Sequence, residues 1–288
     1  MNQKSSNVVR TKSQINYNYA TIKVTQSRID KGLLAIPVTL SEYLPDHNET
    51  IQVYLNDSPN YQSKQYSSYN SSTRECRIGG MREWFQQNNV KSGDEIVIQF
   101  IDEQHYIYRL IPERNFILQT RDLQDNFDNS KTERQASEKI TTLSNWTHLD
   151  KNDVMLNEYL RLTNASIKER EYVARSSIRA RENAPSNLRI LLDNIYKGHC
   201  QVCDFWFVKR DRQPYFEIHH LDPTKGHHPQ NIVVVCGNCH NQFEHADVHQ
   251  EFNDELWLVK VAFNNNMHTV RQAILDQKLK VFFKELFV

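Results

Sequence analysis

Short runs in which hydrophobic and polar residues alternate dominate the chain from Thr21 to about Arg114. They occur at 21–24, 32–38, 51–55, 95–100 and 105–111, with turn-forming residues between them. A period of two is typical of β-strands with one buried face. Residues 81–88 instead have the spacing of a short helix. We therefore predict a β-barrel domain over residues 21–115, preceded by a flexible polar tail over residues 1–20.

The pattern changes over residues 116–185, where glycine and proline are rare, charges are frequent and a weak helical period appears. This composition predicts a helical connector with loops. Between Arg161 and Arg181 it holds six lysines or arginines against two glutamates. If the stretch is one helix, four cations share a face that could follow a DNA backbone; a solvated charged surface is the simpler interpretation. The four are Arg161, Lys168, Arg175 and Arg179.

Residues 186–288 form the third predicted part. Ser186 is a good N-cap for a helix that ends at Gly198 and has leucine and isoleucine at core spacing. A second apolar stripe at helical spacing predicts a C-terminal helix. Its members are Leu275, Leu279, Phe282, Phe283 and Leu286. We expect this helix to pack on the domain, with a dimer contact as the alternative. The fold class is α+β.

The chain has 288 residues and a formal net charge of zero. Zero charge argues against a protein that coats nucleic acid through bulk positive charge, so local patches must carry any affinity for DNA. No run of 18 apolar residues occurs, and residues 1–10 lack the apolar core of a signal peptide. We therefore expect a cytoplasmic protein with no membrane partner.

Four of the five cysteines form two CxxC pairs, Cys200 with Cys203 and Cys236 with Cys239. A two-residue spacing lets a tight turn present both sulfurs to one metal, so the pairs predict a four-cysteine zinc site. The 32 residues between the pairs leave room for a pair of strands and a loop. Four sulfur ligands leave no open position for water, which favours a structural role for the Zn²⁺.

Groups that suit hydrolysis gather between and just after these cysteine pairs. His219 and His220 end a predicted strand, ahead of a turn at Asp222-Pro223, so that one imidazole can bind a metal while the other acts on water. His240 and Glu244 share one face of a helix, and with His219 they make a mixed nitrogen and oxygen site for a divalent ion. A structural histidine pair is the alternative. His227 and His228 fall in a Gly/Pro loop and are expected to be exposed.

The order CxxC, His-His, Asn231, CxxC-His over residues 186–247 resembles the HNH, or ββα-metal, nucleases. The resemblance implies that His219 is a metal ligand and that His220 is the general base that deprotonates the attacking water. It further implies that Asn231 braces the hairpin and holds the His220 ring, and that His240 is the second ligand of a catalytic Mg²⁺ or Mn²⁺. The family often has a second histidine four residues after the last one. Here Glu244 stands at that place, so Glu244 is favoured over His245 as the third ligand.

A second set of short motifs covers the N-terminal part: Arg28 to Pro37, the sequence Gly80-Met-Arg-Glu-Trp84-Phe85, and Val90 to Asp94. Their order resembles the plant-type, B3-like pseudobarrel DNA-binding domain. The resemblance implies two arms that grip the major groove, a first arm at residues 25–31 and a second at 67–77. Their readers of bases and phosphates would be Gln26, Ser27, Arg28, Lys31, Tyr69, Asn70, Ser71, Thr73, Arg74 and Arg77. A small barrel with polar loops and no DNA role is the alternative.

Together these features predict a restriction-type endonuclease that recognises a short double-stranded DNA site and hydrolyses phosphodiester bonds with one divalent metal and a histidine base. A modification-dependent endonuclease for methylated DNA is one alternative. A DNA-binding regulator with a purely structural zinc module is another, which the intact histidine set argues against. Cutting both strands with one site per chain favours a homodimer, and a cognate methyltransferase is a further expected partner.

Overall fold

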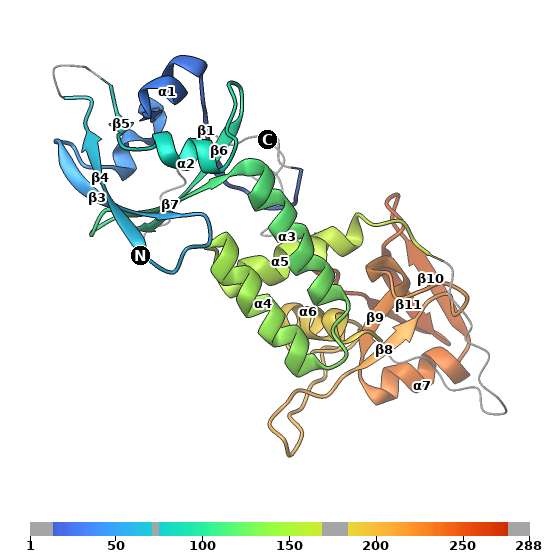
Figure 1. Cartoon of the computed structure of the whole chain (residues 1–288). Coiled ribbons are helices and arrows are strands. Elements are labelled where there is room, and N and C mark those ends of the chain that lie inside the picture. Colours follow the sequence, from blue (N-terminus) through green and yellow to red (C-terminus); the bar gives the residue numbers. More distant parts are fainter. Residues whose placement is uncertain (1–13, 71–74, 169–183, 276–288) are drawn as a thin grey trace, which may run out of the picture. The chain divides into compact units, whose positions relative to one another are not determined.

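The structure, a computed structural model, describes residues 14–70, 75–168 and 184–275 (Figure 1). The chain divides into two compact units, Met1–Asp122 with Trp146–His148, and Leu123–Asn145 with Leu149–Val288. Each is described by itself. Among the described residues, no helix combines the length and the apolar character needed to cross a membrane.

A seven-stranded, barrel-like sheet forms the first unit, with strand order β1-β6-β7-β3-β4-β5-β2. The strands are β1 (Ala20–Lys23), β2 (Leu34–Ala35), β3 (Glu49–Leu55), β4 (Tyr61–Ser67), β5 (Arg77–Ile78), β6 (Glu95–Asp102) and β7 (Ile107–Pro112). The pairing of β3 with β7 is parallel, and the other strand pairs of this sheet are antiparallel. Two short helices, α1 (Gln26–Lys31) and α2 (Arg82–Gln87), and a 3-10 turn, η1 (Val38–Tyr43), complete the unit. This arrangement confirms the predicted β-barrel.

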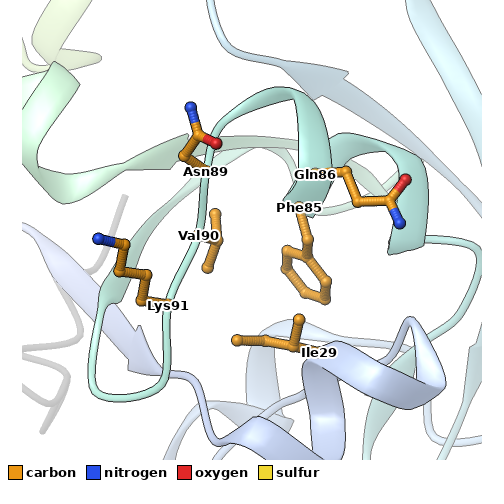
Figure 2. Close-up of a pocket in the computed structure, with 6 residues that line it drawn as sticks. All are labelled: Ile29, Phe85, Gln86, Asn89, Val90 and Lys91. Carbon is orange, nitrogen blue, oxygen red and sulfur yellow. The ribbon is translucent and has the colours of Figure 1, made fainter.

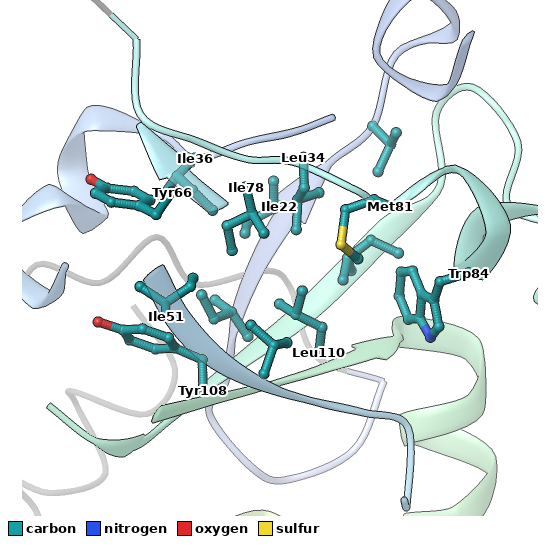
Figure 3. Packing of buried hydrophobic residues seen from close by; sticks show 14 of the residues in the cluster. Ile22, Leu34, Ile36, Ile51, Tyr66, Ile78, Met81, Trp84, Tyr108 and Leu110 are labelled. Atoms are coloured by element: carbon teal, nitrogen blue, oxygen red, sulfur yellow. The ribbon is translucent and has the colours of Figure 1, made fainter. Parts of the chain in front are cut away.

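The barrel core follows from the alternation along the strands (Figure 3). Along β3, Ile51, Val53 and Leu55 are buried while the residues between them are partly exposed. Their side chains meet those of the other strands and of α2 in one apolar cluster. Trp84 and Phe85 of α2 are only 4% and 1% exposed, so they are core residues rather than base-stacking groups.

Two strands of the barrel were not predicted. The exposed face of β4 is polar and, of its seven residues, only Tyr66 is buried, and β5 is two residues long. The first arm contains helix α1, which ends at Gly32 in the left-handed conformation with φ 65°. A Cβ at this glycine would lie 2.9 Å from the Cβ of Arg82, so the turn between α1 and β2 requires glycine.

Helices fill the predicted connector and the start of the third part: α3 (Glu113–Asp128), α4 (Glu133–Thr147), α5 (Lys151–Thr163) and α6 (Ser186–Tyr196). Helix α5 ends at Thr163, so the basic stretch from Arg161 onward does not continue as one helix through Lys168. Arg161 donates to the fully buried Glu158 and to Asp128, each at 2.7 Å. It therefore holds helices together and does not follow a DNA backbone. Arg175 and Arg179 lie outside the described residues.

The second unit continues with a two-stranded hairpin, β8 (Glu217–His220) and β9 (Ile232–Val235), and with helix α7 (Gly237–His245). A 3-10 turn, η2 (Pro229–Asn231), precedes β9, and another, η3 (Ala273–Leu275), follows the last strand. A three-stranded sheet of β10 (Val248–Phe252), β11 (Leu258–Phe263) and β12 (Asn266–Thr269) was not predicted. Its middle strand packs Leu258, Val261 and Phe263 into the same apolar core as β9 and the cysteines.

Two predicted helix ends in this unit need correction. Ser186 is the first residue of α6 and makes no capping hydrogen bond, because Pro185 occupies the N-cap position. At the other end Lys197, with φ 53°, already leaves the helical conformation one residue before Gly198. The predicted C-terminal helix falls on residues 276–288, outside the described part of the chain.

Candidate active site

The two CxxC pairs converge on one point although 32 residues separate them. The sulfur atoms of Cys200, Cys203, Cys236 and Cys239 all lie within 4.8 Å of one another. The first pair follows α6, and the second spans the end of β9 and the start of α7, where the Cys236 sulfur accepts from the Cys239 amide at 3.5 Å. The four cysteines, here called the clasp, therefore enclose the β8–β9 hairpin, as the sequence predicts.

The geometry and chemistry of this cluster fit zinc. Two sulfurs bound 2.3 Å from one tetrahedral zinc are about 3.8 Å apart, and those of Cys203 and Cys236 are 3.7 Å apart. A hydrogen bond with Cys239 lowers the pKa of the Cys200 thiol to about 4 against the effect of burial, while the pKa of Cys239 rises. One thiol of the cluster thus loses its proton readily, but deprotonation of the other thiols needs a cation beside them.

Strand β8 and helix α7 bring a carboxylate against His240. Glu217 accepts a hydrogen bond from His240 Nδ1 and another from the Tyr215 hydroxyl. Burial alone would raise the pKa of Glu217, but these two hydrogen bonds outweigh burial and lower it. The pKa of Tyr215 rises to about 12, chiefly through its hydrogen bond to Glu217. At neutral pH Glu217 is thus a carboxylate that fixes the His240 ring.

This arrangement leaves Nε2 of His240 on the side of Glu244. The Nε2 atom lies 3.5 Å from Oε1 of Glu244, one turn further along α7. Two ligands about 2.1 Å from one ion are about 3 Å apart at a right angle and farther apart at wider angles, so the pair fits a shared divalent ion. A carboxylate behind a metal-bound histidine is a common outer-shell partner. Glu217 was missed in the sequence, although its two-residue spacing from His219 puts both on one face of β8.

His219 lies beside this pair. Its ring stacks on Phe243 with centroids 4.3 Å apart and meets the His240 ring edge-on at 5.4 Å. In the described part of the chain, the four cysteines are the one set of three or more His, Cys, Asp or Glu whose ligand atoms all lie within 4.8 Å of one another. The ligand atoms of His219, His240 and Glu244 therefore do not all lie within 4.8 Å of one another in this conformation.

His220, the next residue, faces the loop that connects β8 to β9. Its Nε2 atom lies 2.9 Å from Nδ1 of His227, and the two rings meet at 64°. The prediction that His227 is exposed is therefore wrong: the residue is half-buried against His220. A Gly/Pro loop indicated an exposed segment, but the loop folds back on the strand end.

Asn231 holds this loop in place. Its Nδ2 group donates to the carbonyl oxygens of Asp222, Lys225 and Gly226 at 3.0, 3.3 and 3.1 Å, and its Oδ1 accepts from the Asp222 amide at 2.9 Å. The side chain is 5% exposed. Asn231 thus fixes the turn that precedes His227, and through it the surroundings of His220.

His228 was also predicted to be exposed, and this too is wrong. It is only 7% exposed. One ring nitrogen donates to the Ala165 carbonyl at 3.0 Å and the other accepts from the Gln230 amide at 3.2 Å, which caps η2. Burial lowers the pKa of His228, so it is a neutral structural residue.

In the first unit the two arms meet through an ion pair between Arg28 of α1 and Glu75, 47 positions apart. Gln26 bonds to Asp30 within α1, at 2.8 Å. The remaining residues predicted to contact DNA lie as follows: Ser27 and Lys31 on exposed parts of α1, Tyr69 and Asn70 exposed after β4, Arg77 half-buried in β5, and Ser71, Thr73 and Arg74 outside the described residues.

A hollow also opens beside α1 in this unit (Figure 2). Ile29, Phe85, Gln86, Asn89, Val90 and Lys91 line it. Its lining includes none of the residues predicted to contact DNA, nor the paired acids or histidines that hydrolysis needs.

Among solved structures, the Arabidopsis FUS3–DNA complex is similar to this chain with 14% identity and a TM-score of 0.27, over 32% of this chain and 92% of that one. The Arabidopsis thaliana transcription factor LEC2–DNA complex is similar with 20% identity and a TM-score of 0.27, over 32% and 88%. No curated protein matches the chain.

The model of one protein family matches the chain, over residues 200–245. That range begins at the first zinc-type cysteine and ends with helix α7, so it contains the clasp, both strands of the hairpin and all the histidines described above. The family is described as HNH endonuclease. Residues 200–245 thus match the HNH endonuclease family, which the cysteine and histidine spacing also indicates.

Proposed function

We propose that the chain is a restriction-type endonuclease, in which the barrel selects a short double-stranded DNA site and the HNH module hydrolyses the phosphodiester bond. The observation that carries the proposal lies inside the matched segment: the His219 ring meets the ring of His240, which lies 3.5 Å from Glu244, and His220 follows His219 at the end of β8. A zinc scaffold needs only the four cysteines. The additional polar groups are those that hydrolysis uses.

In this proposal His220 takes a proton from the attacking water while the water oxygen bonds to phosphorus and the bond to the 3′ oxygen breaks. His219, His240 and Glu244 would hold a single Mg²⁺ or Mn²⁺. When bound, that ion neutralises charge on the phosphate and on the leaving oxygen. Glu217 keeps the His240 ring oriented, and Asn231 keeps the loop beside His220 in place.

Selection of the DNA site is assigned to the two arms of the barrel. Exposed Lys31 and Tyr69 suit contacts with phosphates and bases. The ion pair between Arg28 and Glu75 links the two arms, so that both arms can contact the same groove of the DNA. We further propose that the protein is a homodimer, because cutting both strands at one site requires two active sites or two events. We also propose that it works in the cytoplasm alongside a cognate methyltransferase.

The test is cleavage of plasmid DNA by the full chain loaded with zinc, with Mg²⁺ or Mn²⁺ and with a chelator as control. Substrates with and without methylated bases separate a restriction enzyme from the modification-dependent alternative. We expect wild type to cut and His220→Ala to bind the same DNA without cutting. Binding without cutting by wild type on every substrate would instead support the DNA-binding regulator.

A further inference from the structure

A hairpin extends from the second unit between the first cysteine pair and strand β8 (Figure 1). It covers residues 204–215. Five backbone hydrogen bonds hold it. The Cys200 carbonyl accepts from the Asp204 amide at 2.9 Å, and the Cys200 amide donates to Phe205 O at 3.1 Å. Phe207 O accepts from the Tyr215 amide at 3.0 Å, and two more join Lys209 to residues 212–213 at 2.9 and 2.8 Å. Its base is thus attached to the zinc clasp on one side and to β8 on the other.

Four consecutive large apolar side chains on this hairpin face solvent. Phe205, Trp206, Phe207 and Val208 are 56%, 49%, 42% and 49% exposed. Trp206 stacks on His199 with centroids 5.3 Å apart, and Phe207 stacks on Tyr215 at 4.7 Å. These contacts fix the ring orientations without removing the rings from water. Contiguous exposed apolar surface of this kind marks an interaction site.

Cations follow the aromatic run directly. Lys209, Arg210 and Arg212 lie at the exposed tip. Lys209 pairs with Asp211 at 3.1 Å, and no ion pair within the described residues occupies either arginine. The hairpin therefore combines π-faces with positive charge, which is the chemistry that binds bases and phosphates together.

We propose that the outer part of this hairpin, residues 205–212, enters a groove of double-stranded DNA beside the cleavage site. Its aromatic rings would lie against the bases, and Arg210 and Arg212 would contact the flanking phosphates. Successive residues of an extended segment point to opposite sides, and here both sides are exposed. A groove contacts both faces of a two-stranded ribbon, whereas a flat contact with a second copy of the chain would cover only one. The inference rests on the proposed nuclease function.

The position of the hairpin gives this contact a consequence for cleavage. Tyr215, at its end, donates to Glu217, which holds His240. The chain then runs through Phe216 into β8 and to His219 and His220. DNA held by the hairpin is therefore fixed relative to these histidines. Apolar wedges partly unstack base steps and kink the duplex, so the hairpin would present a deformed phosphate to the site.

Trp206 offers a direct probe. The other tryptophans, Trp84, Trp146 and Trp257, are 4%, 8% and 3% exposed, so acrylamide quenches mainly Trp206. We would measure quenching in the full-length, zinc-loaded His220→Ala protein, with and without a 30-base-pair duplex containing a mapped cleavage site. We expect the duplex to reduce the quenching constant at least twofold, and the change to disappear in Trp206→Phe if the signal belongs to this residue alone.

Binding and cleavage are then compared between hairpin variants and a matched control. Trp206→Ala and the double variant Arg210→Ala/Arg212→Ala are expected to weaken duplex binding about tenfold each and to slow cleavage. Met267→Ala truncates a side chain of similar exposure, 56%, in the same unit and should change neither. Zinc content and circular dichroism establish that each variant is folded.

The inference is overturned if the duplex leaves Trp206 as accessible as before, or if the hairpin variants bind and cut like wild type. It is also overturned if Trp206→Ala converts a dimer to a monomer in sedimentation and leaves DNA binding by the separated chains unchanged. Failure of the proposed function looks different: wild type then cuts no substrate, whatever the hairpin does.

Discussion

The Nε2 atom of His220 lies 2.9 Å from the Nδ1 atom of His227, so one imidazole donates its proton to the other. For Nδ1 of His220 to accept a proton from water, its Nε2–H must be the donor and His227 the acceptor. In the proposed mechanism His227 is this acceptor and would select the form of His220 that can act as a base. It would then be a positioning residue, although the sequence placed it in an exposed loop.

Replacing His227 with alanine removes this acceptor. We expect the single-turnover cleavage rate to fall 10- to 100-fold, the range for loss of an outer-shell partner, with unchanged DNA binding. His227→Asn keeps an acceptor near the same place and should recover part of the rate, which a purely structural role would not explain. His249→Ala, an exposed histidine on β10, is the control. A rate for His227→Ala equal to that of wild type would refute the assignment.

Loss of one of the four clustered cysteines is expected to release the metal. Cys203→Ser should lower zinc content to well below one ion per chain and unfold the second unit, because the closing of the clasp depends on the metal. Cys76→Ala provides the comparison, since Cys76 is buried in the barrel, away from the cluster. Metal analysis and thermal unfolding measure both. Full zinc content in Cys203→Ser would show that the cluster is not the site.

Asn231 is predicted to stabilise the second unit through its amide donors. In Asn231→Asp a carboxylate faces three carbonyl oxygens, so we expect a loss of about 2–4 kcal/mol in the free energy of unfolding. Urea unfolding of zinc-loaded protein measures it. Asn241→Asp, at an exposed position of α7, is the matched control. Equal losses in the two variants would contradict the role of Asn231 as the brace of the loop.

The ion pair between the arms predicts an electrostatic effect on DNA binding. Glu75→Gln frees Arg28 and removes a negative charge, so we expect tighter binding to any duplex and a steeper decrease in affinity with salt. Glu103→Gln removes the same charge at an exposed turn of the barrel away from the arms. Fluorescence anisotropy at several salt concentrations compares them. If both variants gain equally, the effect is overall charge and not the release of Arg28.

The spacing of residues in the sequence was enough to predict those functional groups that lie close together along the chain. The cysteine pairs, the His219-His220 strand end and the helix with His240 and Glu244 each occupy a few residues, and their geometry follows from turns, strands and helices. The HNH resemblance is confirmed by the match over residues 200–245.

What escaped prediction depends on contacts between distant segments. His228 is buried because Ala165, 63 positions earlier, accepts its proton, and nothing in the Gly/Pro loop itself indicates that partner. Glu217 gains its role from His240 on another element. Strands β4, β10 and β12 are mostly exposed, so they lack the alternation that identifies a strand with one buried face.

The position of the cysteines has a consequence for proteolysis. Arg210 and Arg212 make the exposed hairpin a natural site for trypsin, and a cut there separates Cys200 and Cys203 from Cys236 and Cys239. The metal would still join the two pieces, since each piece keeps two of its ligands. The clipped chain should therefore migrate as one particle under native conditions and fall apart into two fragments only when a chelator removes the ion.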